Sequence, residues 1–399
     1  MTDDDRPGFT EFTRTAAARA ELLEAISPVE RTERVPLGAA DERVVARTLD
    51  AQRAVPHYER AAMDGYAVRA SETFGASDRS PGSFRVGDSV GPGTAVQVHT
   101  GSELPAGADA VVKVESTERS GDDLSVFEAV PEGANVAPVG EDVDAGQRLF
   151  EPGHRLRPSD VGLLKAVGFD EVAVYGRPRV SVIPTGEELV QADPEPGEII
   201  ETNGQTVTQY VERWGGEPTY RDVVTDDADA LREAVERDLN NDIIVTTGGS
   251  SVGERDLVPD VVAEMGEVLV HGVALKPGHP VALGVVDGTP VLMLPGYPVA
   301  CIVTAVQFLR PAIERAGHLP EPSVPTTEAR LARKIPSEVG VRTFARVTLD
   351  DGTATPTRAK GAGVLSSVAL ADGWVVVPEG REGYAEGETV AVEQWEWSR

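Results

Sequence analysis

Cysteine and histidine are scarce in this chain, which limits the metal and redox chemistry that it can support. The single cysteine, Cys301, excludes an internal disulfide and any cysteine-rich metal cluster, as is typical of proteins in the reducing cytoplasm. Cys301 has no histidine or acid beside it in the sequence, so we expect a small, buried apolar side chain. The six histidines are scattered and match no histidine zinc site. We therefore expect a cytoplasmic protein without disulfides.

Long hydrophobic runs and basic charge are also in short supply. The most apolar long stretch, residues 297–309, is too short to span a bilayer, and the acidic N-terminus MTDDDRPGF lacks the apolar core of a signal peptide. The 66 acidic residues outnumber the 37 basic ones, which gives a net charge of -29. Such a charge excludes nucleic acid and anionic membrane surfaces as the main partners.

The excess acid predicts a particular kind of surface. Acidic residues recur along the whole chain, as in residues 2–5, 225–229 and 347–351, and the basic residues are mostly arginine. This distribution is typical of a solvated surface adapted to high salt, so most individual carboxylates are expected only to bind water. The sequence predicts a halophilic protein.

The 399 residues are too many for one ordinary core, and their patterns change along the chain. Apolar residues at helical spacing predict a helix over residues 8–26, and a second helix is expected at 158–167, on the far side of a β-rich stretch. Alternating strand and helix patterns then predict a mostly parallel sheet with helices on both faces, followed by a small β-barrel. The predicted fold class is multidomain α/β plus β: a three-layer α/β domain, an inserted β domain, an N-terminal helical and extended region, and a C-terminal barrel. The expected boundaries are 1–50 with 140–178 for the N-terminal domain, 51–139 for the inserted domain, 179–320 for the α/β domain and 321–399 for the barrel.

The strongest local signal for a functional site is the segment TTGGSSVGERD, residues 246–256. It follows the aliphatic run of residues 243–245, which predicts a buried strand. Glycines let the backbone approach a ligand, and their free N–H groups suit an oxyanion, whereas Glu254 and Asp256 suit a hard cation such as Mg²⁺. The segment matches neither a Walker A loop nor a GxGxxG fingerprint. A glycine turn with surface acids is the alternative.

Other candidate loops also follow predicted strands, where α/β sheets bind their ligands. Thr185 to Glu188 and the acids at 226–227 bring carboxylates to that edge, although acids in the first turn of a helix are also explained by the helix dipole. The segment KPGHP offers Lys276 as a cation for a phosphate. His279 in the same segment is a weaker candidate for an anion or a metal. The segment LPGYP, residues 294–298, suits either a ligand loop or a rigid turn into a helix.

Several segments, taken in order, resemble one known family. They are AAMDGYAV, HTGSELPAGADAVVKVE, VGEDVDAG, TGEEL, TTGGSSVGERD, KPGHP, LPGYPVA and GAGVLSS. The set is similar to the molybdopterin molybdenumtransferase family, MoeA, which is also represented by the C-terminal domain of gephyrin, over nearly the whole chain. The resemblance implies a four-domain subunit and a homodimer whose cleft lies between the α/β domain of one subunit and the first two domains of the other. It also implies an activity: adenylylated molybdopterin and molybdate are taken, the adenylate is cleaved with the help of Mg²⁺, and AMP is released.

The resemblance also implies which residues form the site. The implied catalytic residues are Asp64, Asp142, Glu188, Asp226, Asp256 and Lys276, of which Glu188 and Asp256 are also expected to hold Mg²⁺. The residues expected to bind the pterin or its phosphates are Thr100, Thr185, Gly248, Gly249, Ser250, Ser251, His279, Pro295, Gly296, Pro298, Ser366 and Ser367.

Two departures from the family pattern leave the substrate open. Where many members have a second lysine, this chain has His279, and where many have LPGNP followed by valine and serine, it has Tyr297 and Ala300. Tungstate is therefore an alternative to molybdate. Two other functions remain: the preceding step, by a molybdopterin adenylyltransferase that shares the α/β domain and is expected to act upstream, and a non-catalytic pterin-binding scaffold.

Overall fold

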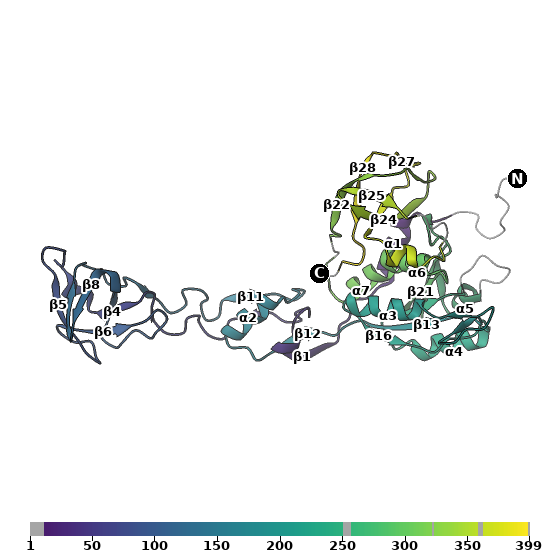
Figure 1. Ribbon diagram of the computed structural model, residues 1–399. Coiled ribbons are helices and arrows are strands. Elements are labelled where there is room, and N and C mark those ends of the chain that lie inside the picture. The colour runs from purple at the N-terminus through teal and green to yellow at the C-terminus, as the bar shows by residue number, and fades with distance from the viewer. Residues whose placement is uncertain (1–11, 250–256, 321–322, 358–361, 398–399) are drawn as a thin grey trace. The chain divides into compact units, whose positions relative to one another are not determined.

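The computed structural model describes residues 12–249, 257–320, 323–357 and 362–397. The chain forms two compact units, whose elements are labelled in Figure 1. The large unit consists of Met1–Thr32 and Tyr175–Arg399, and the small unit consists of Glu33–Val174. Asp256, Ser250 and Ser251, which belong to the predicted site, lie outside the described residues.

A six-stranded mixed sheet is the centre of the large unit, with the strand order β16-β13-β17-β21-β20-β18. The first four strands are parallel and the last two are antiparallel. In β13, β17 and β21 nearly every side chain is buried, as parallel strands covered on both faces require. The prediction of a mostly parallel sheet is confirmed. The bounds are β16 Glu217–Tyr220, β13 Arg179–Pro184, β17 Ile243–Thr247, β21 Thr289–Leu294, β20 Ala282–Val286 and β18 Glu267–His271.

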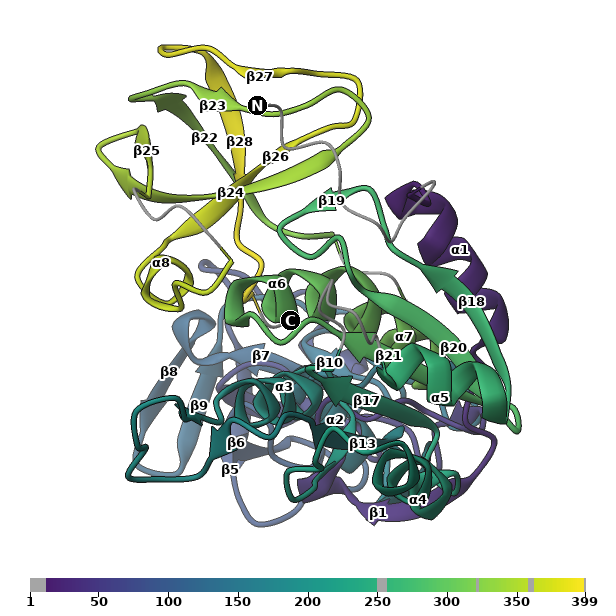
Figure 2. The same cartoon turned by 90° about the vertical axis from the view of Figure 1, so that its right-hand side faces the viewer.

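Helices cover both faces of this sheet and complete three layers (Figure 2). One face packs against Leu22 of α1, Val207 of α3 and Phe308 near α7, and the other packs against Leu231 of α4 and Val261 of α5. The helices are α1 Thr15–Ala25, α3 Asn203–Arg213, α4 Ala228–Asp238, α5 Leu257–Met265, α6 Pro298–Thr304 and α7 Arg310–Ala316. Among the described helices, none is both long and apolar enough to cross a membrane.

The helical stretch from residue 298 to residue 316 is divided into two helices. A π-helical turn, Ala305–Leu309, separates α6 from α7. Pro311 follows this turn and cannot donate a backbone hydrogen bond to the preceding turn, which accounts for the local change of helix type.

The C-terminal strands close into the predicted barrel. The strand order is β24-β25-β22-β28-β26, and β26 pairs back onto β24. A short strand from the α/β part of the chain, β19, adds to β24 in parallel and places Lys276 opposite Thr343. The bounds are β19 Leu275–Lys276, β22 Thr326–Leu331, β24 Arg342–Asp350, β25 Thr353–Pro356, β26 Gly373–Val377 and β28 Thr389–Glu393; the shorter elements of the large unit are β14 Leu189–Val190, β15 Ile199–Ile200, β23 Ile335–Pro336, α8 Ser366–Ala369 and β27 Gly383–Tyr384.

The small unit is β-rich, as the sequence predicts. Its main sheet has six strands in the order β7-β4-β6-β5-β9-β8, around a core that includes Tyr66, Phe84 and Leu124. The bounds are β1 Thr32–Pro36, β2 Leu49–Asp50, β3 Arg60–Ala61, β4 Gly65–Val68, β5 Gly82–Val86, β6 Thr94–Val98, β7 Ala110–Lys113, β8 Thr117–Ser120, β9 Asp123–Val126, β10 Val136–Ala137, β11 Arg148–Phe150, α2 Pro158–Ala166 and β12 Glu171–Tyr175.

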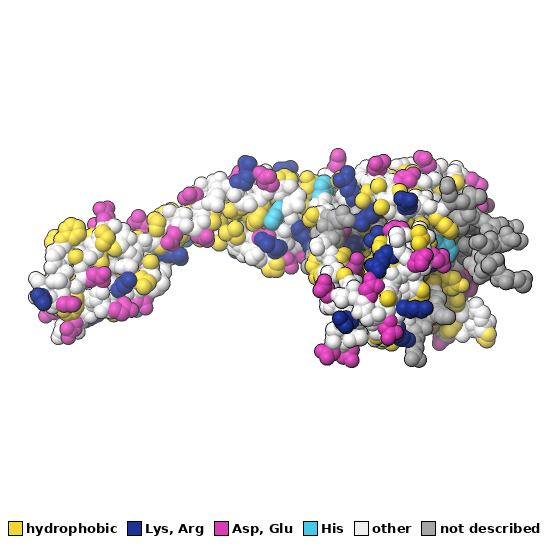
Figure 3. Space-filling model, turned by 90° about the horizontal axis from the view of Figure 1, so that it is seen from above, with side chains coloured by type: hydrophobic (Ala, Val, Ile, Leu, Met, Phe, Trp, Pro, Cys, Tyr) yellow, Lys and Arg dark blue, Asp and Glu magenta, His cyan; other side chains and the backbone are white. Residues whose placement is uncertain are grey.

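Acidic side chains are spread over the visible face of both units in Figure 3, with basic side chains between them. No part of this face carries basic charge alone, in keeping with a composition of 66 acidic and 37 basic residues. A surface of this kind suits the predicted adaptation to salt, since hydrated carboxylates keep a protein soluble.

Candidate functional site

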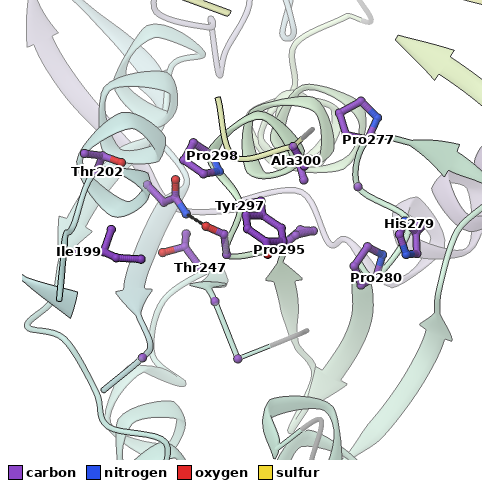
Figure 4. Close-up of a pocket in the computed structure, with 18 of the residues that line it drawn as sticks. Ile199, Thr202, Thr247, Pro277, His279, Pro280, Pro295, Tyr297, Pro298 and Ala300 are labelled. Atoms are coloured by element: carbon purple, nitrogen blue, oxygen red, sulfur yellow. Dashed lines mark hydrogen bonds between the residues drawn. The ribbon is translucent and has the colours of Figure 1, made fainter. Parts of the chain in front are cut away.

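A cavity of about 1550 Å³ lies in the large unit, where β13, β17 and β21 end. The loops that follow these strands line it (Figure 4), and barrel residues between Lys334 and Thr357 line it as well. The predicted site residues that line it are Thr185, Glu188, Asp226, Gly248, Gly249, Lys276, His279, Pro295, Gly296 and Pro298. Because parallel strands end at one edge of the sheet, loops distant in sequence meet here.

The glycine turn after β17 is packed tightly against the neighbouring loop. Gly248 has a φ of +120°, and a Cβ atom there would lie 2.2 Å from the carbonyl oxygen of Thr185. Gly249 has a φ of +66°, and a Cβ there would lie 2.5 Å from Val258. Only glycine fits both positions.

The backbone amide of Gly248, which we expected from the sequence to donate to an oxyanion, donates to another strand instead. Its N–H donates to the carbonyl oxygen of Leu294 at 3.0 Å and so ties the glycine turn to β21. The prediction that this amide faces an anion is wrong, because the hydrogen bond to the strand already uses the donor. Of the described residues of this turn, Gly249 is the one left to approach a ligand.

Buried hydroxyl groups lie beneath the same turn. The side chains of Thr185 and Thr247 are 1% exposed and line the cavity. Within the described part of the chain, neither Oγ1 atom has a hydrogen-bond partner. Gly249 lies directly over Thr185, since a Cβ on the glycine would be 3.0 Å from the threonine Oγ1. Buried hydroxyl groups usually have partners, so this pair points to a polar ligand or to the neighbouring loop as their acceptor.

Two acidic loops reach the cavity but differ in what their carboxylates do. Asp227 caps α4, because it accepts hydrogen bonds from the amides of Asp229 at 3.1 Å and Ala230 at 2.9 Å. Asp226 is exposed and lines the cavity. Glu188 is also exposed and folds back over Gly186, where a Cβ would lie 2.8 Å from its Oε2 atom. Glu187, which is exposed and lines the cavity too, Glu188 and Asp226 are therefore carboxylates that a ligand could reach.

These carboxylates fit a hard cation in type. Carboxylate oxygens are the ligands that Mg²⁺ prefers in proteins. Within the ranges that the structure describes, no group of three or more His, Cys, Asp and Glu side chains is close enough to hold a metal ion. Glu188 and Asp226 both line the cavity, and Asp256 lies outside the described residues.

Basic side chains lie on the barrel side of the cavity. Lys276 is in β19, and its Nζ contacts Oε1 of Glu338 at 2.8 Å. Lys334 and Arg346 line the same side, and burial lowers the pKa of Arg346. The sequence analysis did not single out these two residues, because nothing in the local pattern of a barrel strand indicates which loop it will face. The cavity is thus lined by carboxylates from the α/β loops and by cations from β19 and the barrel.

The remaining loops of the wall are held in place by local contacts. His279 lines the cavity while its ring packs edge-on against Phe12, with centroids 5.9 Å apart. The side chain of Asn203 donates from Nδ2 to the carbonyl oxygen of Gly296 at 2.7 Å, the dashed line in Figure 4. Pro298 occupies the first turn of α6, as predicted. Cys301 is buried as expected, and burial raises the pKa of its thiol.

Three predicted residues belong to the small unit. Asp64 accepts hydrogen bonds from the amide of Thr100 at 2.6 Å and from its Oγ1 at 2.9 Å, so these two residues form a local pair. The hydrogen bond from the Thr100 amide, with that from its hydroxyl, lowers the pKa of Asp64. Asp142 is exposed, and its amide donates to Val55.

The two predicted serines of the barrel do not line the cavity. Ser367 is buried and donates from Oγ to the carbonyl oxygen of Val364 at 2.7 Å, which stabilises the short helix α8. Ser366 is exposed, whereas Ala362 and Gly363 from the preceding turn reach the cavity wall. The predicted contact of Ser366 and Ser367 with a ligand of this cavity is not supported by their positions, since a short backbone turn separates them from it.

Three family descriptions match the chain in sequence. They are "MoeA N-terminal region (domain I and II)" over residues 13–168, "Probable molybdopterin binding domain" over 181–315 and "MoeA C-terminal region (domain IV)" over 328–395. Together they span most of the chain, including every loop of the cavity wall.

Named relatives and a solved structure resemble the chain over nearly its whole length. A putative molybdopterin biosynthesis protein of Methanocaldococcus jannaschii is 35% identical, with 93% of this chain and 94% of the relative covered. The molybdopterin molybdenumtransferase of Bacillus subtilis is 32% identical, with 92% of each chain covered. A crystal structure of the molybdopterin biosynthesis MoeA protein from Pyrococcus horikoshii superimposes with a TM-score of 0.81 at 33% identity, covering 96% of this chain and 100% of that one. The chain belongs to the MoeA family of molybdopterin biosynthesis proteins.

Proposed function

We propose that this protein is a molybdopterin molybdenumtransferase, which inserts molybdate into adenylylated molybdopterin and releases AMP. Relatives that carry this name are 30–32% identical over most of the chain. The observation that carries the proposal is one cavity lined by buried hydroxyls, exposed carboxylates and cations. A substrate with phosphates, a divalent cation and an oxyanion needs all three kinds of group.

The phosphate end of the substrate is assigned to the glycine turn. Thr185 and Thr247 provide buried hydroxyl donors, and Gly249 lets the backbone come close. Donors fixed before the substrate arrives stabilise charge that develops on the phosphates, at little cost of reorganisation. Gly248 contributes by letting the turn pack closely against Thr185, since its amide already donates to Leu294.

The molybdate end is assigned to the barrel side. Lys276, Lys334 and Arg346 line that wall and are the cations that an oxyanion requires. Molybdate and tungstate are dianions of the same shape, so nothing in these side chains selects between them. Molybdate is proposed on the names of the relatives.

Magnesium is proposed as the cofactor, held by Glu188 and Asp256, with Asp226 close to the same wall. When bound, the ion offsets the negative charge of the phosphates and of the leaving AMP. The described part of the chain places Glu188 and Asp226 at the cavity. Changing Asp256 to Ala is expected to abolish AMP release without changing the unfolding temperature; near-normal activity would remove this assignment.

We further propose a cytoplasmic homodimer that acts after a separate adenylyltransferase. Light scattering of the purified protein tests the dimer, with a particle mass of one 42.2 kDa chain as the contradicting result.

Adenylylated molybdopterin, molybdate and Mg²⁺ are supplied in the test of activity, and AMP release in a single turnover is expected. Formation of adenylylated pterin from molybdopterin and MgATP would instead identify an adenylyltransferase, and binding without AMP release would identify a scaffold.

A further inference from the structure

The cavity contains an exposed aromatic side chain that no role described above uses. Tyr297, from the loop between β21 and α6, is 65% exposed and lines the cavity. Aromatic residues are only 5% of this chain, and most of its large aromatic side chains are buried or half-buried. An exposed aromatic ring in a ligand cavity offers a flat apolar surface that another flat ring can cover.

One side of this ring is supported by backbone. A Cβ built on Gly363 would lie 3.3 Å from Cδ1 and 3.7 Å from Cε1 of Tyr297, so the ring lies against a glycine of the barrel turn. The support fixes where the ring sits, and the remaining surface faces the cavity (Figure 4). The contact with Gly363 therefore leaves room for a ligand on the open side.

The loop that carries Tyr297 is held in one conformation. Asn203 donates to the carbonyl oxygen of the preceding Gly296 at 2.7 Å, and Pro295 and Pro298 restrict the backbone on both sides. A ring that is already held in place loses little entropy when a ligand covers it. Preorganisation of this kind is typical of a binding residue rather than of a mobile surface side chain.

The loop also lies beside the proposed phosphate site. A Cβ built on Gly296 would be 3.4 Å from Cα of Gly248, so the two turns touch. A phosphate held at the glycine turn would therefore bring the ring attached to it within reach of the neighbouring Tyr297. Ile199 and Ile200, which are 58% and 44% exposed, add aliphatic surface to the same cavity.

We propose that Tyr297 is a stacking platform for a planar fused heterocycle of the substrate. The inference rests on the proposed function, which supplies two such rings, the adenine and the pterin of adenylylated molybdopterin. Both contain a planar nitrogen heterocycle within a fused ring system that is linked to phosphate. Tyr297 thereby determines how tightly the ring end of the substrate is held, while the glycine turn holds the phosphate.

The test compares ligands that have and lack the ring. Binding of AMP, ribose 5-phosphate and anaerobic molybdopterin is measured by calorimetry for the wild type, Tyr297→Phe and Tyr297→Ala. Loss of a stacking partner should weaken a ring-bearing ligand by roughly tenfold to a hundredfold in Tyr297→Ala. Tyr297→Phe should bind within about twofold of the wild type, because it keeps the ring. Ribose 5-phosphate should bind all three proteins equally.

Each outcome has one meaning. Weakened AMP binding assigns the platform to adenine, and weakened molybdopterin binding assigns it to the pterin. The proposal is overturned if Tyr297→Ala binds both ring ligands like the wild type, if ribose 5-phosphate is weakened as much as they are, or if the wild type binds neither ring ligand. AMP release by the wild type is measured separately. If the wild type releases AMP and Tyr297→Ala binds the ring ligands like the wild type, only the proposed stacking role is refuted. If ring binding depends on Tyr297 but the wild type does not release AMP, only the proposed transferase activity is refuted.

Discussion

The ion pair between Lys276 and Glu338 makes a specific prediction about oxyanion affinity. The two side chains meet at 2.8 Å and are 49% and 69% exposed. If Lys276 binds molybdate, the anion must compete with this carboxylate. Glu338→Gln removes the competing charge but keeps a side chain of nearly the same size. We therefore expect this variant to bind molybdate more tightly than the wild type.

The size of the effect can be estimated from the exposure of the pair. An exposed ion pair contributes about 0.2–1 kcal/mol, and this is the interaction that molybdate must replace. A carboxylate and a dianion about 6 Å apart in a water-like medium repel each other by about 1.4 kcal/mol, before salt reduces it. After screening by salt, the two contributions together favour molybdate binding to Glu338→Gln by about 1–2 kcal/mol. The dissociation constant of this variant should therefore be roughly 5- to 30-fold lower than that of the wild type.

Calorimetric titration with molybdate measures this change directly. Glu328→Gln is the matched control, because Glu328 is an exposed glutamate of β22 that does not line the cavity. The control should change the dissociation constant by less than about twofold, through net charge alone. The advantage of Glu338→Gln should also shrink as salt rises, since the pair is exposed. Unchanged or weaker binding by Glu338→Gln would refute the reasoning.

Three further predictions concern stability. Gly248→Ala should lower the free energy of unfolding by at least about 1–3 kcal/mol, because its φ is +120° and its Cβ would meet Thr185; an unchanged denaturation midpoint would argue against the described turn. Burial opposes ionisation of Asp160, but hydrogen bonds from Arg157 and His154 outweigh it and lower its pKa to about 2. A lowered carboxyl pKa stabilises the fold fully above the unfolded value of about 3.8 and progressively less as the pH falls towards 2. Asp160→Asn should therefore cost about 1–2 kcal/mol at pH 7 in denaturant titrations, and a cost that persists unchanged at pH 2 would contradict this account. The net charge of -29 predicts a melting temperature that rises between about 0.1 M and 2 M KCl, and a constant melting temperature would count against halophilic adaptation.

The order of the elements was predictable because its signals are local. A few consecutive residues are enough to predict a strand, as in the aliphatic run of β17 and the alternating pattern of β24 in the barrel. The strand β18 carries a short apolar run, residues 268–270, but only one of its five residues is fully buried, and the sequence analysis did not predict it. The antiparallel direction of β20 depends on pairing across the sheet, which no local pattern reports.

The site was predictable to the extent that it follows from strand ends. Glu188, Asp226 and Lys276 could be placed at one cavity because the loops after neighbouring strands share an edge of the sheet. The hydrogen bond from the Gly248 amide to the carbonyl oxygen of Leu294 could not be predicted, since it depends on the distance between two strands in three dimensions. Arg346 lines the cavity from the barrel, and Glu338 of the barrel contacts Lys276, so both are distant in sequence from the loops of the α/β part.

The central claim is that this cavity releases AMP as molybdenum is transferred. Its most direct test is a single turnover with purified protein, adenylylated molybdopterin, Mg²⁺ and molybdate, followed by chromatography of the nucleotide product. We predict one equivalent of AMP per active site and molybdenum retained on the pterin. Intact adenylylated molybdopterin at the end of the reaction, with the protein folded and the substrate bound, would contradict the claim.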